Sequence, residues 1–86
     1  MNKNILVTGC AGFIGYHVAT KLIENNYSVI GIDNLNNYYD KKLKFLRLKQ
    51  LRKISRKGNF KFFKIDICHE KHLKNLFKKY KFKTIL

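Results

Sequence analysis

The feature that most constrains this chain is a turn of regularly spaced glycines between a short apolar run and an amphipathic segment. The turn reads TGCAGFIG over residues 8–15, so Gly9, Gly12 and Gly15 recur at every third position. The apolar residues before the turn predict a buried strand over residues 4–8. The three- and four-residue spacing of apolar side chains after it predicts a helix over residues 13–25. A strand that leads into a helix in this way is typical of a parallel sheet with helical crossovers.

Each glycine of this turn has a predicted physical role. Gly9 permits the tight turn out of the strand, Gly12 lets a diphosphate approach the backbone, and Gly15 allows the helix to pack closely on the sheet. The free N–H groups and the dipole at the start of the helix favour a negatively charged group. Asp33 follows the next predicted strand, residues 28–32, where its carboxylate can bind ribose hydroxyls and repel a 2′-phosphate. The pattern predicts a dinucleotide site selective for NAD, with a purely structural turn as the alternative.

The remainder of the chain continues the same alternation of strands and helices. Predicted elements are a helix over 41–56, a strand over 60–65, a helix over 69–80 and a strand over 82–86. The order βαβαβαβ gives an α/β fold class, the N-terminal half of a Rossmann fold with a parallel sheet in the order 3-2-1-4. We expect one partial domain over residues 1–86, truncated at the fourth strand, whose outer edge is left open.

Two of these segments carry predictions about individual side chains. The helix over 41–56 has a broad apolar arc that Lys44 and Arg47 interrupt, formed by Leu43, Leu46, Leu48, Leu51 and Ile54. The helix over 69–80 has an apolar stripe of Leu73, Leu76, Phe77 and Tyr80. In the strand over 60–65, Lys61 and Lys64 predict an edge position, because charged side chains there discourage stray pairing.

Composition limits the class of protein and its partners. The chain of 86 residues has a net charge of +14, and residues 41–86 hold seventeen basic against two acidic residues. That asymmetry is the signature of a polyanion-binding surface, but basic faces of amphipathic helices are more often only solvated, so nucleic acid is the disfavoured partner. No apolar run is long enough for a membrane span or a secretory signal, which together with two unpaired cysteines predicts a cytoplasmic protein.

Other residue clusters are weaker candidates for chemistry. Cys68, His69 and His72 form a partial metal set, but a closed zinc site needs four ligands, so we predict no metal. His17 has no acid or nucleophile placed to form a triad. Tyr38 and Lys42 have the Tyr-x-x-x-Lys spacing but lie in and beside the loop that follows Asp33, and we interpret that spacing as chance. No catalytic residue is predicted in this chain.

Longer stretches of the sequence resemble a known family. The runs VTGCAGFIG, GIDNLNNYYD and FKIDI resemble the start of an extended short-chain dehydrogenase/reductase. The DNLNNYYD segment narrows the resemblance to the NAD-dependent sugar-nucleotide epimerases and dehydratases, and the chain is most similar to their UDP-glucuronate 4-epimerase branch. The likeness extends over essentially all 86 residues, but only over the first quarter or so of such an enzyme.

The resemblance implies a cofactor and a set of residues that bind it. The pyrophosphate is expected on the backbone at Phe13 and Ile14, the ribose on Asp33, the adenosine near Asn34 and Asn37, and the adenine beside Asp66 and Ile67. In that family hydride leaves C4 of a UDP-sugar for NAD and returns to the opposite face, while a Tyr-x-x-x-Lys pair transfers the proton. That pair and the UDP-sugar site lie beyond Leu86 in the family. We therefore expect this isomerase fragment to be inactive alone, unless a C-terminal half complements it.

Two alternatives to an enzyme fragment remain open on the sequence. One is a stand-alone module that binds NAD without catalysis. The other is a basic nucleic-acid-binding protein that uses residues 41–83, although the chain has no recognised nucleic-acid-binding signature.

Overall fold

The fold is a three-layered α/β arrangement whose elements alternate along the chain. The structure is a computed structural model that describes residues 4–35, 41–55 and 58–86. Its elements are β1 (Asn4–Thr8), α1 (Phe13–Glu24), β2 (Ser28–Asp33), α2 (Lys41–Ile54), β3 (Phe60–Lys64), α3 (Glu70–Lys79) and β4 (Thr84–Ile85). The predicted order βαβαβαβ is confirmed, and every element begins and ends within two residues of its predicted bounds.

All four strands form one parallel sheet in the order β3-β2-β1-β4, which confirms the predicted Rossmann topology. β1 and β2 are the central strands, paired from Asn4 with Ser28 to Thr8 with Ile32. One position beyond that last pair lie Gly9 and Asp33. The register therefore brings the glycine turn and the predicted ribose acid to the same edge of the sheet.

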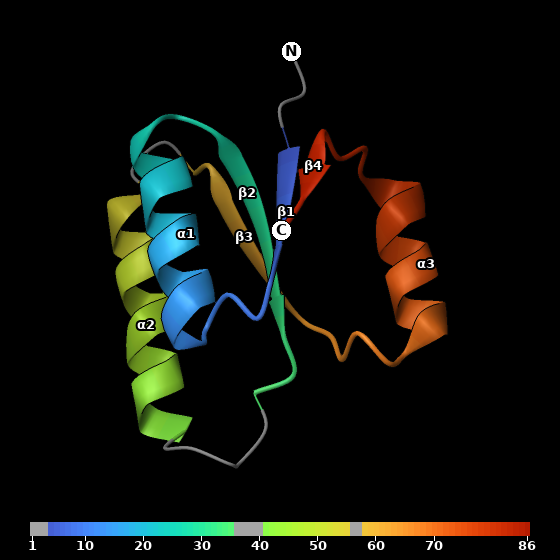
Figure 1. Cartoon of the computed structure of the whole chain (residues 1–86), viewed down its shortest axis with the longest axis horizontal. Coiled ribbons are helices and arrows are strands. Elements are labelled where there is room, and N and C mark those ends of the chain that lie inside the picture. The colour runs from blue at the N-terminus through green and yellow to red at the C-terminus, as the bar shows by residue number, and fades with distance from the viewer. Residues whose placement is uncertain (1–3, 36–40, 56–57) are drawn as a thin grey trace.

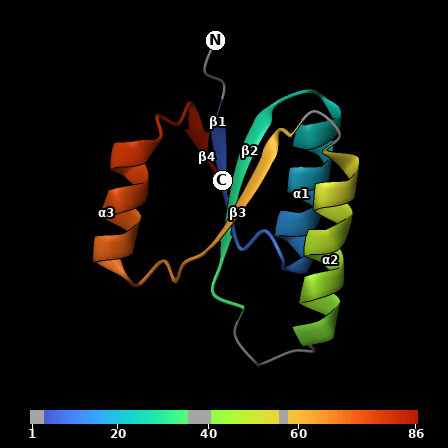
Figure 2. The same ribbon diagram turned by 180° about the vertical axis from the view of Figure 1, so that it is seen from behind.

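Helices cover both faces of this sheet. α1 and α2 lie side by side on one face and α3 lies on the other (Figures 1 and 2). The buried cluster beneath α1 and α2 includes Ile5, Val7, Cys10, Ala19, Ile23, Val29, Leu48 and Leu51. The cluster beneath α3 is smaller and consists of Leu6, Ile30, Ile32 and Leu76. Side chains alternate between the two faces along a strand, so β1 and β2 contribute to both clusters.

The two edge strands differ in how they are protected. β3 lies at one edge and has exposed lysines at Lys61 and Lys64, as predicted. β4 lies at the other edge and is shorter than expected, although Lys83 and Leu86 extend its pairing through hydrogen bonds of 2.8 Å to the carbonyls of Asn4 and Leu6. Within the described residues, no strand pairs with the outer side of β4.

The predicted apolar arc of α2 is wrong at the N-terminal end of the helix. Leu48 and Leu51 are buried, but Leu43 and Leu46 are 44% and 59% exposed. The inward positions of these turns belong instead to Lys44 and Arg47, which stand one turn before Leu48 and Leu51 on the same helical face. The face is rotated because both basic side chains have hydrogen-bond partners inside the fold.

The stripe predicted for α3 is narrower than expected. Leu76 is buried, and Leu73 and Tyr80 are half-buried against the sheet. Phe77 is 42% exposed and packs edge-on against Phe82, with ring centroids 5.5 Å apart. Among the helices of the described residues, none combines the length and the apolar character needed to cross a membrane.

Candidate functional site

The glycine turn joins β1 to α1 in a conformation that depends on Gly9. Gly9 has a φ of +63°, in the left-handed region that favours glycine. Its carbonyl accepts a hydrogen bond of 2.9 Å from the Gly12 amide, and the Cys10 amide donates to the Ile32 carbonyl at 3.2 Å. These bonds close the turn and tie it to the end of β2. The predicted role of Gly9 is therefore confirmed.

Gly15 allows α1 to begin directly against this turn. A Cβ at position 15 would lie 2.1 Å from the Gly9 carbonyl oxygen and 2.7 Å from the Gly9 carbonyl carbon, far inside van der Waals contact. We expected Gly15 to permit close packing on the sheet. In the structure, the close contact of Gly15 is with the backbone of the glycine turn, at Gly9 and Cys10.

The N-terminus of α1 offers backbone donors to a ligand. Gly12 is the N-cap residue and makes no side-chain capping bond, and the first turn contains no acidic residue. The first N–H groups of a helix have no acceptor within the helix. Phe13 and Ile14, the predicted pyrophosphate residues, are 67% and 75% exposed, so this end of the helix is open. Uncapped donors and the helix dipole together suit an anion.

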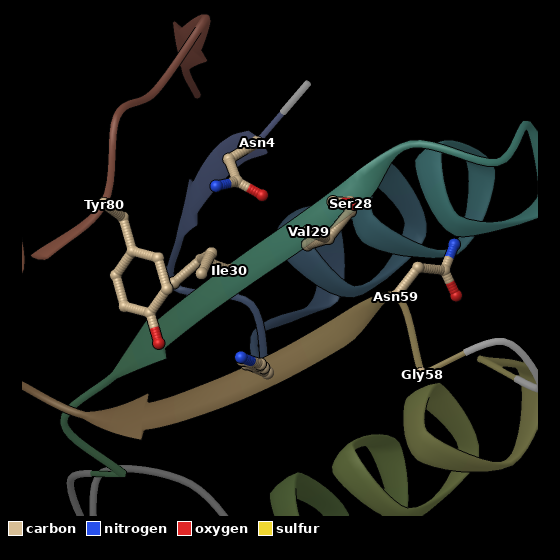
Figure 3. A pocket seen from close by; sticks show the side chains of 8 residues that line it. Asn4, Ser28, Val29, Ile30, Gly58, Asn59 and Tyr80 are labelled. Atoms are coloured by element: carbon tan, nitrogen blue, oxygen red, sulfur yellow. The ribbon is translucent and has the colours of Figure 1, made fainter. Parts of the chain in front are cut away.

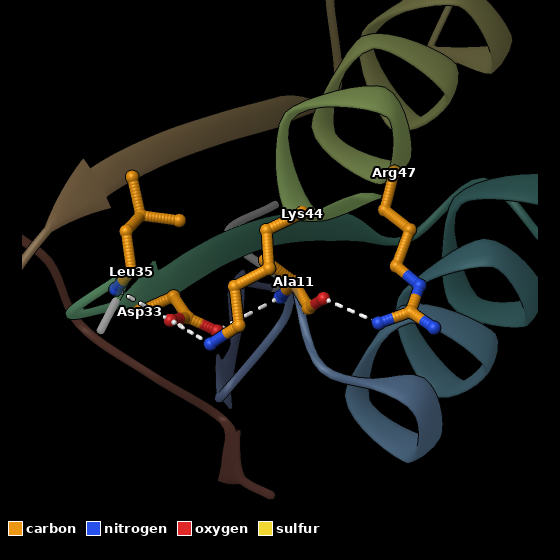
Figure 4. Close-up of polar contacts among 5 residues, drawn as sticks. All are labelled: Ala11, Asp33, Leu35, Lys44 and Arg47. Atoms are coloured by element: carbon orange, nitrogen blue, oxygen red, sulfur yellow. Dashed lines mark hydrogen bonds and ion pairs between the residues drawn. The ribbon is translucent and has the colours of Figure 1, made fainter. Parts of the chain in front are cut away.

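Asp33 lies beside this helix end and is almost fully buried, with 5% of its surface exposed. Its Oδ2 accepts a hydrogen bond of 3.1 Å from the Ala11 amide, and its Oδ1 accepts one of 2.7 Å from the Leu35 amide (Figure 4). Lys44 completes the set, since its Nζ lies 3.1 Å from the same Oδ1. The buried carboxylate is thus balanced by two backbone donors and one cation.

Two basic residues of α2 belong to the site although the sequence analysis did not assign them to it. Lys44 forms the ion pair with Asp33, and the Arg47 Nη1 donates a hydrogen bond of 3.0 Å to the Ala11 carbonyl. The peptide groups of Ala11 are therefore held from both sides, by Asp33 and by Arg47 (Figure 4). The sequence does carry a signal for these residues, because they interrupt an otherwise apolar helical face.

The segment that follows β3 supplies another acid at the same edge of the sheet. Asp66 accepts a hydrogen bond of 2.8 Å from the Cys68 amide on its Oδ1. This backbone bond is the main cause that holds the pKa of Asp66 below its usual value, with further hydrogen bonding from Asn34. The shift favours the ionised form of the Asp66 carboxyl group.

These residues surround a hollow of about 320 Å³ at the carboxyl edge of the sheet. Six of the predicted site residues line it, namely Gly9, Gly12, Asp33, Asn34, Asp66 and Ile67, together with Thr8, Ile32, Lys44 and Ile65. Phe13, Ile14 and Gly15 lie at the adjacent helix end rather than in its lining. Asn37 lies outside the described residues. Carboxyl edges of parallel sheets, at a point where the strand order reverses, are where such folds bind ligands.

A second hollow, of about 390 Å³, lies at the opposite, amino edge of the sheet. Figure 3 shows its lining, which comes from Asn4, Ser28, Val29, Ile30, Gly58, Asn59, Lys61 and Tyr80. The Asn59 side-chain amide donates to the carbonyls of Tyr27 and Ile23 at 2.9 and 3.3 Å. Among the described residues that line this hollow, there is neither a helix N-terminus nor an acid.

The cysteines and histidines lie in two different surroundings. Cys10 is buried beneath the turn, where loss of solvation and the Asp33 carboxylate raise the pKa of its thiol from 9.0 to about 12. His69 and His72 stack with ring centroids 5.1 Å apart beside the exposed Cys68. Within the described part of the chain, no three His, Cys, Asp or Glu residues are grouped to hold a metal ion.

Two further sequence features are the remaining histidine and the Tyr-x-x-x-Lys spacing. His17 contacts Phe13 and Tyr16 through ring edges, with centroids 4.8 and 5.4 Å away. Tyr38 lies outside the described residues, and Lys42 lies on α2. The interpretation of this spacing as chance therefore stays a prediction.

Comparison with known proteins gives consistent matches. The model of the GDP-mannose 4,6 dehydratase family matches residues 6–86. A UDP-glucuronate 4-epimerase of Thermodesulfobacterium geofontis is 44% identical over 81 residues, which is 94% of this chain and 24% of that protein. Human dTDP-D-glucose 4,6-dehydratase is 40% identical over 98% of this chain and 23% of its own length.

Solved structures agree with these matches. A UDP-glucuronic acid 4-epimerase variant of Bacillus cereus, solved with a fluorinated UDP-sugar and NAD, superposes with a TM-score of 0.79 and 32% identity, over 95% of this chain and 24% of that one. The NAD complex of dTDP-glucose 4,6-dehydratase from Bacillus anthracis gives a TM-score of 0.75 at 28% identity, over 96% and 25% of the two chains. The chain thus spans about a quarter of the length of the relatives it matches.

Proposed function

Because the chain belongs to the GDP-mannose 4,6-dehydratase family of short-chain epimerases and dehydratases, we propose that its carboxyl-edge site binds NAD as the cofactor-binding part of a sugar-nucleotide epimerase. The observation that carries the proposal is the juxtaposition of an uncapped helix N-terminus with a buried acid, both at the rim of one hollow. The solved relatives that contain NAD support this choice of ligand.

The residues present fit a dinucleotide. The amides of Phe13 and Ile14 would hold the pyrophosphate at the exposed helix end. Asp33 has about four acceptor positions, and the bonds from Ala11, Leu35 and Lys44 use three of them, so one remains for a ribose hydroxyl. Asp66 and Ile67 would flank the adenine from the segment after β3, and Asn34 and Asn37 would lie near the adenosine.

The chemistry of the proposed epimerase divides between this chain and the rest of the enzyme. When bound, NAD supplies a hydride acceptor for C4 of a UDP-sugar. The residues of this chain orient the cofactor and hold its phosphates, while the Tyr and Lys of proton transfer and the sugar-nucleotide site would come from another part of the enzyme. The four-fold greater length of the relatives supports this division. We propose that residues 1–86 alone bind NAD without epimerising a UDP-sugar.

Calorimetric titration of the 86-residue chain with NAD tests the proposal. We expect saturable binding with one NAD per chain. Replacing Asp33 with Ala should weaken binding by about 10- to 100-fold, because hydrogen bonds to a charged group contribute about 1.5–3 kcal/mol. Since Asp33→Ala also removes bonds that hold the fold, its circular dichroism spectrum and its melting temperature are compared with those of the parent chain.

A second variant separates binding from folding. Ile67 lines the hollow and is 60% exposed, so Ile67→Ser should leave the melting temperature almost unchanged and weaken NAD binding by about fivefold. Ile85→Ser is the matched control, because Ile85 is 52% exposed on β4 and does not line the hollow. A folded chain that fails to bind NAD, or that responds equally to both substitutions, would refute the proposed site.

A further inference from the structure

The ion pair between Lys44 and Asp33 bears on which dinucleotide the site accepts. Both side chains are largely buried, with 12% of Lys44 and 4% of Asp33 exposed, and both line the hollow at the carboxyl edge. Their 3.1 Å separation is that of a direct charge-assisted hydrogen bond. A bare carboxylate at the end of β2 would repel a 2′-phosphate on the adenosine ribose. Here the carboxylate has its own counter-ion.

The charge of the pair must be considered together. Asp33 contributes −1 and Lys44 +1, so at the ribose end of the hollow the pair is neutral rather than acidic. Interactions between charges are stronger at buried positions than in water, which makes this compensation effective at short range. The other acid of the lining is Asp66, which lies after β3 and bonds the Cys68 amide.

Lys44 also has donors to spare. An ammonium group carries three N–H donors and no acceptor. Within the described part of the chain, the Lys44 side chain makes one hydrogen bond, to Asp33 Oδ1, which uses one of these donors. Because Lys44 lines the hollow, its other N–H donors are available to a ligand there. A phosphate dianion is a better acceptor for them than a hydroxyl group.

We propose that Lys44 is a specificity-determining residue that offsets the repulsion between Asp33 and a 2′-phosphate, so that the site accepts NADP as well as NAD. The inference rests on the proposed function, because it assigns a selectivity to the same dinucleotide site. It replaces the simpler expectation that Asp33 alone excludes NADP. Lys44 is a residue of α2. Its ammonium group lies at the site because the helical face that carries Lys44 and Arg47 is turned toward the interior.

A purely structural role for Lys44 makes a different prediction. If Lys44 only holds Asp33 and the turn in place, then its loss should weaken NAD and NADP binding by the same factor. If it offsets charge, its loss should weaken NADP binding more than NAD binding. The ratio of the two dissociation constants separates these roles, because a common loss of folded protein cancels from it.

The experiment measures the dissociation constants of NAD and NADP for the full chain and for three variants by calorimetric titration. Lys44→Met should raise the ratio of the NADP constant to the NAD constant by about tenfold, because the carboxylate is then left without its cation. Lys44→Arg keeps the charge and should keep the parent ratio. Lys49→Met removes a charge from an exposed position on the same helix and is the control.

Each outcome supports or refutes the role of Lys44 in selectivity between NAD and NADP. A ratio that rises in Lys44→Met and not in Lys49→Met supports the proposal, whereas an unchanged ratio refutes it and leaves NAD binding intact as a separate result. A chain that binds neither nucleotide refutes the proposed function, and with it the selectivity. If Lys44→Met does not fold, Lys44→Gln removes the charge while it keeps a donor for Asp33, and the same ratio is measured.

Discussion

The sheet has one hollow at the carboxyl ends of its strands, the carboxyl edge, and one at their amino ends, the amino edge. The two hollows are similar in size, but the residues that line them differ in chemistry. The carboxyl edge encloses about 320 Å³ and the amino edge about 390 Å³. At the carboxyl edge, a buried acid and a cation line the hollow and an uncapped helix begins beside it. At the amino edge, the Asn59 amide bonds two backbone carbonyls, and Lys61 lies over the Tyr80 ring. Volume alone does not distinguish a binding site from a structural gap.

The difference follows from the topology of the chain. Each parallel strand runs toward the carboxyl edge, and the following helix begins there, so its N-terminal donors collect at that edge. β1 lies between β2 and β4, and the crossovers that follow β1 and β3 go to opposite faces of the sheet. This reversal opens a crevice outside the carboxyl ends of the strands. At the amino edge α1 ends, and Asn59 donates to the carbonyl of Ile23 in its last turn and to that of Tyr27 beyond it.

The largest expected effect on stability and NAD binding comes from replacing Gly15, which lies beside the glycine turn at the carboxyl edge. Gly15→Ala would place a Cβ 2.1 Å from the Gly9 carbonyl oxygen. We expect a loss of about 3 kcal/mol or more in the free energy of unfolding, together with loss of NAD binding. Urea denaturation followed by circular dichroism measures the first, and titration measures the second. A variant as stable as the parent would mean that the turn is not packed as described.

Replacing Asn59 tests the contribution of the amino edge to stability. Asn59→Ala removes two hydrogen bonds to partly buried carbonyls, so the free energy of unfolding should fall by about 1–2 kcal/mol. NAD affinity should stay within about twofold of the parent, because the bonds lie at the far edge of the sheet. The control is Asn75→Ala at an exposed position of α3, which should change neither quantity. Weaker NAD binding in Asn59→Ala would contradict the separation of the two edges.

Cys10 gives a smaller, pH-dependent effect beneath the carboxyl-edge turn. Its thiol pKa is raised from 9.0 to about 12, so the folded chain keeps a proton that the unfolded chain loses above pH 9. The stabilisation from the neutral thiol is complete below pH 9 and is lost as the pH rises toward 12. Between pH 8 and 10 we expect a loss of about 1 kcal/mol relative to Cys10→Ala, measured by urea denaturation. Parallel pH profiles would show that Cys10 ionises normally.

The elements and their order were predictable from the sequence because they depend on local patterns, and several residues named for the site line one hollow in the structure. Glycine spacing, a short apolar strand and an acid at the end of the next strand are all readable without a structure. The same patterns predicted the edge position of β3 from Lys61 and Lys64. The resemblance to the short-chain epimerases added Asp66 and Ile67, and the structure places both in the lining of the hollow with Asp33.

The parts that sequence reasoning missed depend on contacts between distant residues. Lys44 and Arg47 turn inward because Asp33 and the Ala11 carbonyl, eleven and thirty-six positions away, need donors. A hydrophobicity pattern cannot register that need, so Leu43 and Leu46 were assigned to the buried face that Lys44 and Arg47 occupy. Phe77, which the pattern placed in the stripe of α3, is 42% exposed and contacts Phe82 in the segment before β4.

The most direct test of the account is to map NAD binding onto the backbone amides of the chain by two-dimensional NMR. We expect NAD to shift the amide signals at the carboxyl edge, over residues 9–15, 33–35 and 66–68. Signals at the amino edge, from Ser28 and Asn59, should not move. Shifts at the amino edge, or no shifts in a folded chain at saturating NAD, would contradict the claim that the glycine turn and Asp33 form a nucleotide site.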